Sequence, residues 1–216
     1  MIRHLLAVCL LLTLAAPGCT QIAPLRAKAP DPAVNEGEWA AVRGSATRRD
    51  VIYDRFQHRA TATVTYLGPA VREARVRRLG VWLGWSEQEL KKNLDAEAAE
   101  AARYEDFLVA FYTADRHSDD LDSTRSVWRI ALRLESGNEL VTHDAHVLDA
   151  NATMRNLFPY IGPFDTVYRV RFDRAPGEPL SGRRFTLDLA SALGKMELTF
   201  GDGTRGPDRA QGEPIP

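Results

Sequence analysis

Alternation of hydrophobic and polar residues is the clearest pattern in this chain. Side chains of a strand point alternately to opposite faces, so the alternation predicts strands with one wet and one dry face. The segment 106–113 is instead apolar on both faces and fits a central strand, and a turn at Ser136–Asn138 precedes a strand near 140–148. About seven strands of this kind predict an antiparallel β-sandwich. The alternating segments are 60–66, 128–134, 167–172, 185–189 and 196–200.

One region departs from the β pattern and predicts helices. Ser86 and Glu89 form a Ser-x-x-Glu capping box, and the residues that follow are rich in Ala, Glu and Leu without Gly or Pro. This predicts a helix from Glu87 to Tyr104. Pro69 can open a shorter helix that runs through Leu79 and ends at Gly80. The fold class is therefore expected to be mainly β (α+β): a sandwich-like antiparallel domain with a helix or helical hairpin inserted at about 69–104.

The N-terminal residues have the features of an export signal. A basic start at Arg3 and His4 precedes an apolar run from Leu5 to Ala16 and the small pair Pro17-Gly18. A helix as long as this run spans roughly 18 Å against a hydrocarbon core of roughly 30 Å, so it is too short for a comfortable membrane span. Residues 1–18 are therefore expected to be a removed signal peptide.

The cysteine that follows the expected cut suggests a lipid anchor. Its position after small residues resembles a bacterial lipoprotein signal, which implies that Cys19 becomes the first mature residue and carries lipid. The chain has two cysteines, and Cys9 would leave with the signal peptide, so Cys19 would otherwise be an odd thiol. The alternatives are an ordinary secretory signal cut near Ala16 and a cytosolic protein with a buried N-terminal helix. By resemblance to the sorting rules of lipoproteins in some Gram-negative bacteria, Thr20 after the cysteine favours the outer membrane, facing the periplasm.

The regions that flank the expected domain are rich in Pro or Gly. Pro24, Pro30 and Pro32 interrupt residues 19–38, which are expected to be the lipid anchor and a flexible tether. Residues 201–216 contain several glycines and prolines and are expected to be a disordered tail. The globular domain is expected to span 39–200.

The charge balance limits the classes of partner. The formal net charge is −1, which lacks the basic excess of a nucleic-acid-binding protein. Arginines on the wet strand faces are expected to pair with carboxylates across strands, with anionic lipid or glycan as the alternative. These are Arg129, Arg133, Arg169 and Arg171. The expected partners are the membrane, through lipid on Cys19, and an envelope protein.

The acidic loop between two expected strands has some features of a calcium site. Oxygen ligands at alternate positions are typical of a calcium loop, and Asp115, His117, Asp119 and Asp120 are the nearest candidates for metal ligands. However, Asp120 occupies the position of the sharp-turn glycine and Ser126 that of the final glutamate. A solvated acidic loop without metal is therefore expected.

Three histidines do not suggest a metal site either. His143 and His146 have an odd spacing, which places them on opposite faces of a strand. His58 is an isolated residue of an expected strand. No zinc site is expected from these residues.

The sequence contains no recognisable catalytic constellation. Neither a Gly-x-Ser-x-Gly elbow nor a phosphate-binding glycine loop occurs, and no cofactor is indicated. The function expected is a structural or interaction role. Two alternatives stay open, a periplasmic small-ligand-binding module with a cavity under the helix and a hydrolase assembled from scattered residues.

An aromatic loop before one of the expected strands is the main surface candidate. Its apolar residues Phe158, Tyr160, Ile161 and Phe164 lie among prolines, and such side chains are enriched in protein interfaces. If exposed, they would form a partner-binding patch; otherwise they would plug one end of the sandwich.

Three segments resemble a group of uncharacterised bacterial lipoproteins. They are LFPYIGPFDTVYRVRF (157–172), SVWRIALRLE (126–135) and FLVAFYTADR (107–116). The resemblance implies a similar anchor before a mixed β-rich domain. It implies no activity and no catalytic residue.

Overall fold

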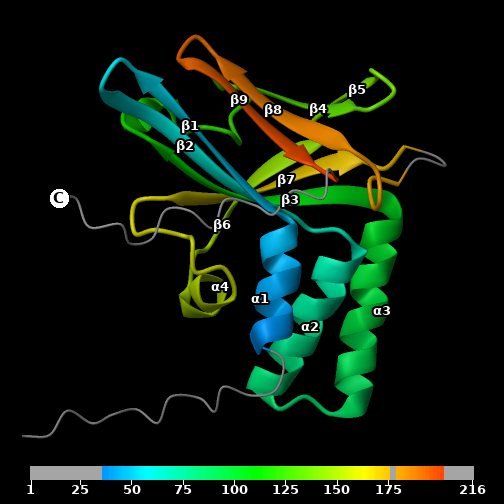
Figure 1. Ribbon diagram of the computed structural model, residues 1–216. Helices are drawn as coiled ribbons and strands as arrows, with labels where there is room; N and C mark the ends of the chain where they lie inside the picture. The colour runs from blue at the N-terminus through cyan, green and yellow to red at the C-terminus, as the bar shows by residue number, and fades with distance from the viewer. Residues whose placement is uncertain (1–35, 176–178, 202–216) are drawn as a thin grey trace, which may run out of the picture. The chain divides into compact units, whose positions relative to one another are not determined.

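The computed structural model describes residues 36–175 and 179–201, and within them two antiparallel sheets pack against each other (Figure 1). The larger sheet has the strand order β1 (Thr47–Asp54), β2 (Gln57–Tyr66), β3 (Tyr104–Thr113), β7 (Thr166–Asp173), β6 (Asp144–Leu148). The smaller sheet has the order β5 (Glu139–Val141), β4 (Arg129–Leu134), β8 (Phe185–Ser191), β9 (Gly194–Phe200). The expected antiparallel, mainly β fold is confirmed.

The sheets enclose an apolar core built from the dry faces that the alternation predicts. Val64, Val109 and Val170 from the larger sheet meet Leu132 and Leu187 from the smaller one, and all are buried. Aromatic rings fill one end of this core. Burial of apolar area is the main stabilising term for such a sandwich.

In the described part of the chain, four helices accompany the sheets: α1 (Glu36–Ser45), α2 (Pro69–Leu83), α3 (Glu87–Arg103) and the short α4 (Ala152–Leu157). A second buried cluster joins Trp39 of α1, Val71 of α2 and Phe158 after α4 to Leu108 and Ala110 of β3. These β3 residues alternate with those of the first core, so the cluster lies on the other face of the larger sheet. The described domain therefore has three layers: the smaller sheet, the larger sheet and the helices (Figure 1).

The expected helical hairpin is present, and its ends follow from local chemistry. Ser86 and Glu89 form the reciprocal capping box at the start of α3, and Pro69 occupies the first turn of α2. The expected end of α2 at Gly80 is wrong. A side chain there would press on Leu90 and Trp85, so Gly80 permits close packing, while Gly84 has the left-handed φ of 63° that ends the helix.

The expected strand near 140–148 is two strands in different sheets. β5 pairs with β4 and β6 pairs with β7. Between them, the Thr142 hydroxyl donates to the Ile130 carbonyl and the His143 amide to the Arg171 carbonyl, at 2.9 and 2.8 Å. These two bonds hold the chain where it crosses from one sheet to the other.

Side chains of β1 join the two sheets at their other edge. Arg48 Nε donates to the Thr199 carbonyl at 2.8 Å, and Asp50 Oδ2 accepts from the Glu197 amide at 2.9 Å. Backbone groups of β9 thus find partners without a regular ladder. Neither β1 nor α1 was expected, because their segments show no strong period.

The predictions for the chain ends lie mainly outside the described residues. These are the signal peptide 1–18, Cys19, most of the tether 19–38 and the tail that follows Gly201. Residues 36–38 belong to α1, so that part of the expected tether is helix instead. Among the described helices, none is long and apolar enough to cross a membrane.

Candidate functional site

The helix-side face of the larger sheet carries an aromatic surface at the end that lies away from the helices. We define this aromatic surface by Tyr53, His58, Tyr112 and Phe164. The His58 ring stacks on Tyr112 with centroids 5.1 Å apart, and Tyr53 lies 5.5 Å from His58 on its other side. Rings from three strands and the loop before a fourth therefore gather on one surface.

A break in the register explains why these rings share a face. Ile52 pairs with Ala60 but Tyr53 pairs with His58, so the pairing slips by one residue between them. Such a bulge reverses the side to which the next side chains point. His58 Nε2 forms a 2.6 Å hydrogen bond with the Thr61 hydroxyl, which fixes the ring beside Tyr112.

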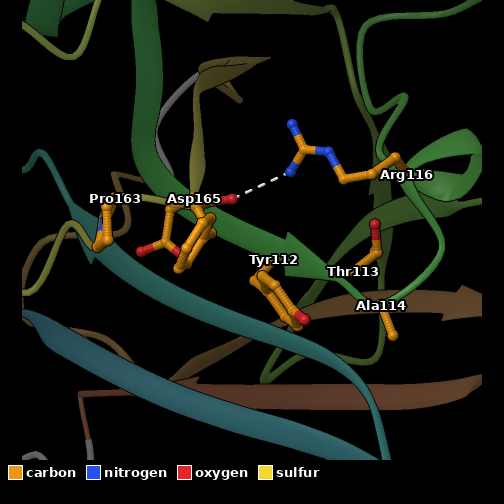
Figure 2. A pocket seen from close by; sticks show the side chains of 7 residues that line it. Tyr112, Thr113, Ala114, Arg116, Pro163 and Asp165 are labelled. Atoms are coloured by element: carbon orange, nitrogen blue, oxygen red, sulfur yellow. Dashed lines mark hydrogen bonds between the residues drawn. The ribbon is translucent and has the colours of Figure 1, made fainter.

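An open cleft of about 500 Å³ lies beside Tyr112 (Figure 2). The end of β3 forms one wall, and the loop before β7 forms the other. Arg116, which begins the 3₁₀ turn η1 (Arg116–Ser118), reaches across from a third side. The lining residues are Tyr112, Thr113, Ala114, Arg116, Pro163, Phe164 and Asp165.

The polar groups of the cleft are held by their own loops. Arg116 donates to the Phe164 carbonyl at 3.0 Å and lies 3.2 Å from the Asp119 carboxylate. Asp165 Oδ2 accepts from the Gly162 amide at 2.7 Å. The cleft thus combines two aromatic walls with an exposed guanidinium, a combination suited to stacking and hydrogen bonding.

The structure corrects the expected partner patch of Phe158, Tyr160, Ile161 and Phe164. Phe158 and Ile161 are 1% and 5% exposed and belong to the helix-side core. Tyr160 is partly buried against the same cluster, and its hydroxyl shares a 2.6 Å hydrogen bond with Thr65. Only Phe164, at 72%, is open to solvent. The loop therefore fills space under the helices, where the Phe158 ring packs edge-on against Trp39 of α1.

The acidic loop uses its side chains for internal hydrogen bonds. Asp119 accepts from the hydroxyls of Thr166 and Tyr168, at 2.5 and 2.9 Å. Asp115 accepts from the His117 amide, and Asp120 from the Ser126 hydroxyl. Within the described ranges, no group of three or more His, Cys, Asp or Glu side chains could hold a metal ion.

His143 and His146 lie near different carboxylates. His143 Nδ1 is 3.1 Å from Asp173, and His146 Nε2 is 3.1 Å from Asp144. His143 also precedes β6 rather than lying within a strand. The two histidines therefore have separate surroundings.

A buried ion cluster that the sequence did not reveal ties the helices to the larger sheet. Asp106 of β3 accepts two hydrogen bonds from Arg171 of β7, at 2.7 and 2.8 Å, and one from Arg72 of α2 at 2.6 Å. Glu97 and Glu100 of α3 bind the same two arginines. Burial alone would raise the pKa of Asp106, but the hydrogen bonds from Arg171 and Arg72 outweigh it and hold that pKa below its ordinary value.

This cluster is structural rather than catalytic. Each carboxylate in it is already bonded to a guanidinium, so none is available as a base. Hydrogen bonding to Asp106 raises the pKa of Arg171, so its charge is retained at any physiological pH. The sequence left open a ligand cavity under the helices. The side chains of the helix-side cluster pack in the space between the helices and the larger sheet.

The four arginines expected on wet strand faces all pair with carboxylates, although Arg171 lies under the helices rather than on a wet face. Arg171 binds Asp106, Arg169 lies 3.6 Å from Asp144, and Arg133 bridges Asp188 and Glu197. Arg129 pairs with Glu139. Cross-strand pairing therefore accounts for these side chains without lipid or glycan.

Comparison with known proteins adds little to this site. No protein-family model matches the chain, and neither does any curated protein. A solved structure of a protein of unknown function from Burkholderia pseudomallei is similar, with 10% identity and a TM-score of 0.42 over 76% of this chain and 82% of that chain. A likeness at that level carries no argument about function. The resemblance to uncharacterised bacterial lipoproteins stays a prediction.

Proposed function

We propose that this protein is a lipid-anchored component of a bacterial envelope, with a structural or interaction role. The observation that carries the proposal is the placement of Cys19 directly after a short apolar run and the Pro17-Gly18 pair. Acylation there leaves more than one chain in the bilayer, and two chains suffice for stable anchoring. The outer membrane, with the domain in the periplasm, is the proposed address.

The aromatic surface is the proposed contact for an envelope protein partner. Tyr and Phe provide large, rigid contact area, and they are enriched at the centres of protein interfaces. Tyr53 is 64% exposed and Phe164 72%, and both lie outside the two cores. Arg116 at the rim of the cleft supplies a donor that can orient a partner.

The anchor is tested by replacing Cys19. Wild-type protein is expected in the membrane fraction, with the mass of its N-terminal peptide increased by acyl chains. Cys19→Ala should release the domain or leave it with an uncut leader. A wild-type peptide with an unmodified thiol would overturn the anchor.

The interaction role is tested with a photo-crosslinking residue at position 164 or 112 in the full chain, in intact cells. A discrete adduct is expected from both positions and should disappear with Tyr53→Ser. The control places the crosslinker at Val127, which is exposed and lies outside the aromatic surface. Equal adducts from all three positions would mean that the aromatic surface has no selective partner.

A further inference from the structure

The turn between α2 and α3 presents an unusual set of apolar side chains. Its sequence is Val81-Trp82-Leu83-Gly84-Trp85. Val81 and Leu83 are 50% and 59% exposed, and Trp82 and Trp85 are partly exposed. Successive helix positions are about 100° apart, so the side chains of 81, 82 and 83 surround the helix end rather than forming one stripe. We call the four apolar residues Val81, Trp82, Leu83 and Trp85 the hairpin tip.

The hairpin tip is rigid. The Trp85 amide donates to the Gly80 carbonyl at 2.9 Å, and the Trp85 ring packs where a side chain on Gly80 would lie. The Arg78 guanidinium covers the Trp82 ring at 4.7 Å. Apolar groups that stay exposed on a rigid turn are available to an external apolar phase.

The position of the start of α1 indicates which apolar phase the hairpin tip would meet. α1 starts at Glu36 and ends beside the sheet, where α2 begins, so α1 and α2 run in opposite directions (Figure 1). At about 1.5 Å per residue, α1 extends about 15 Å from the sheet and α2 about 22 Å. Glu36 therefore lies at the same end of the helical layer as the hairpin tip. The chain that leads back to Cys19 joins the domain at this end.

We infer that the hairpin tip rests in the interface of the membrane that holds the lipid on Cys19, an inference that depends on the proposed anchor. Trp side chains favour the membrane–water interface, and exposed Val and Leu gain by entering it. Arg78 is buried, and Arg77 and Lys91 pair with Glu73 and Asp95. The exposed apolar side chains, rather than a basic excess, therefore carry the inferred contact. The β1–β2 hairpin, with Tyr53, lies at the far end of the larger sheet (Figure 1). The aromatic surface would then lie at the end of the sheet that is far from the hairpin tip.

Tryptophan emission tests this orientation. The full mature chain is placed in vesicles of phosphatidylethanolamine and phosphatidylglycerol that carry brominated acyl chains. Trp39 and Trp128 are 2% and 5% exposed, so bromine should quench only the two tryptophans of the hairpin tip, at most about half of the emission. Val81→Glu with Leu83→Glu should remove most of this quenching without lowering the melting temperature. The matched control, Val141→Glu on the exposed edge strand, should leave the quenching unchanged.

Different results separate this inference from the proposed anchor. The mass of the Cys19 peptide reports lipidation, whereas quenching reports the hairpin tip. Lipidated protein that stays on vesicles without any quenching would retain the anchor and overturn the membrane contact. Emission shifts that depend on protein concentration rather than on lipid would assign the hairpin tip to a second copy, which also overturns it. Unlipidated protein that is still quenched when mixed with vesicles would overturn the anchor alone.

Discussion

The two faces of strand β3 are both buried, but different forces hold them. On the inter-sheet face, the Phe107 ring contacts the rings of Tyr66, Phe172, Phe185 and Phe200, with centroids 5.3 to 6.0 Å away. On the helix face, its neighbour Asp106 is surrounded by guanidinium groups. Aromatic contact tolerates small shifts, whereas a carboxylate bonded to two arginines fixes the relative position of β3, β7 and α2.

The polar contacts on the helix face of β3 fix the position of the helices on the larger sheet. Arg72 also donates through Nε to the Leu67 carbonyl at 2.7 Å, so one side chain joins α2 to the end of β2 and to β3. Glu97 of α3 binds both Arg72 and Arg75. A buried ion cluster adds little net stability over apolar packing, but removal of one member is costly because the others lose their partner.

Phe107→Ala is expected to have the largest effect. The change leaves a cavity at the centre of five packed rings and should reduce the free energy of unfolding by about 4 kcal/mol. Chemical denaturation followed by circular dichroism measures the loss, which should affect the whole domain in one transition. Phe164→Ala provides the matched control, since that ring is exposed and its loss should cost less than about 0.5 kcal/mol. Equal losses would contradict the assignment of Phe107 to the core.

Asp106→Asn is expected to rank second, at about 3 kcal/mol, because Arg72 and Arg171 lose the most deeply buried carboxylate of the cluster and keep the more exposed Glu97 and Glu100. The loss should appear first in the helical layer, as faster amide hydrogen exchange in α2 and α3 than in β8. As a control, Asp95→Asn removes an exposed carboxylate that pairs with the exposed Lys91 and should leave exchange unchanged. Equally faster amide exchange in helices and sheets would show that the buried ion cluster does not act locally on the helical layer.

Acid should remove the contribution of Asp106. Its pKa is lower in the folded chain than the ordinary value of 3.8, so its stabilising effect is complete above that value and is lost as the pH falls through the folded pKa. The difference in unfolding free energy between wild type and Asp106→Asn is therefore expected to be constant near neutral pH and to shrink below about pH 4. Urea titrations across this range measure it. A difference that grows in acid would contradict the sign of the pKa shift.

Most strands were predictable because one physical rule, burial of alternate residues, acts along them. That rule located β2, β4, β7, β8 and β9, whereas a run apolar on both faces located β3 and the capping box located α3. β1 was not predicted because its partly buried face includes Arg48 and Asp50, which form hydrogen bonds with backbone groups of β9. The split between β5 and β6 depends on a crossing between sheets that no local pattern encodes.

The site was less predictable than the fold. Phe158 and Phe164 belong to the same loop and look alike in sequence, yet one is buried and the other exposed. The stack of Tyr53, His58 and Tyr112 depends on a bulge in the register and on strands distant in sequence. For Asp106 a signal was present, since a carboxylate at the start of a strand with two dry faces needs a buried cation. The hairpin tip was also visible as an apolar run with two tryptophans at a helix end.

The smallest effect is expected from a matched change in one tryptophan on each side of the larger sheet. Trp39 Nε1 donates to the Leu157 carbonyl at 3.0 Å, and Arg43 donates to the same carbonyl, so Trp39→Phe leaves that oxygen bonded. Trp128 Nε1 donates to the Ser118 carbonyl at 2.7 Å within the inter-sheet core. Trp39→Phe should therefore cost about 1 kcal/mol and Trp128→Phe about twice that, measured by denaturation. A larger loss at Trp39 would mean that α1 contributes more to the stability of the domain than its contacts in the helix-side cluster imply.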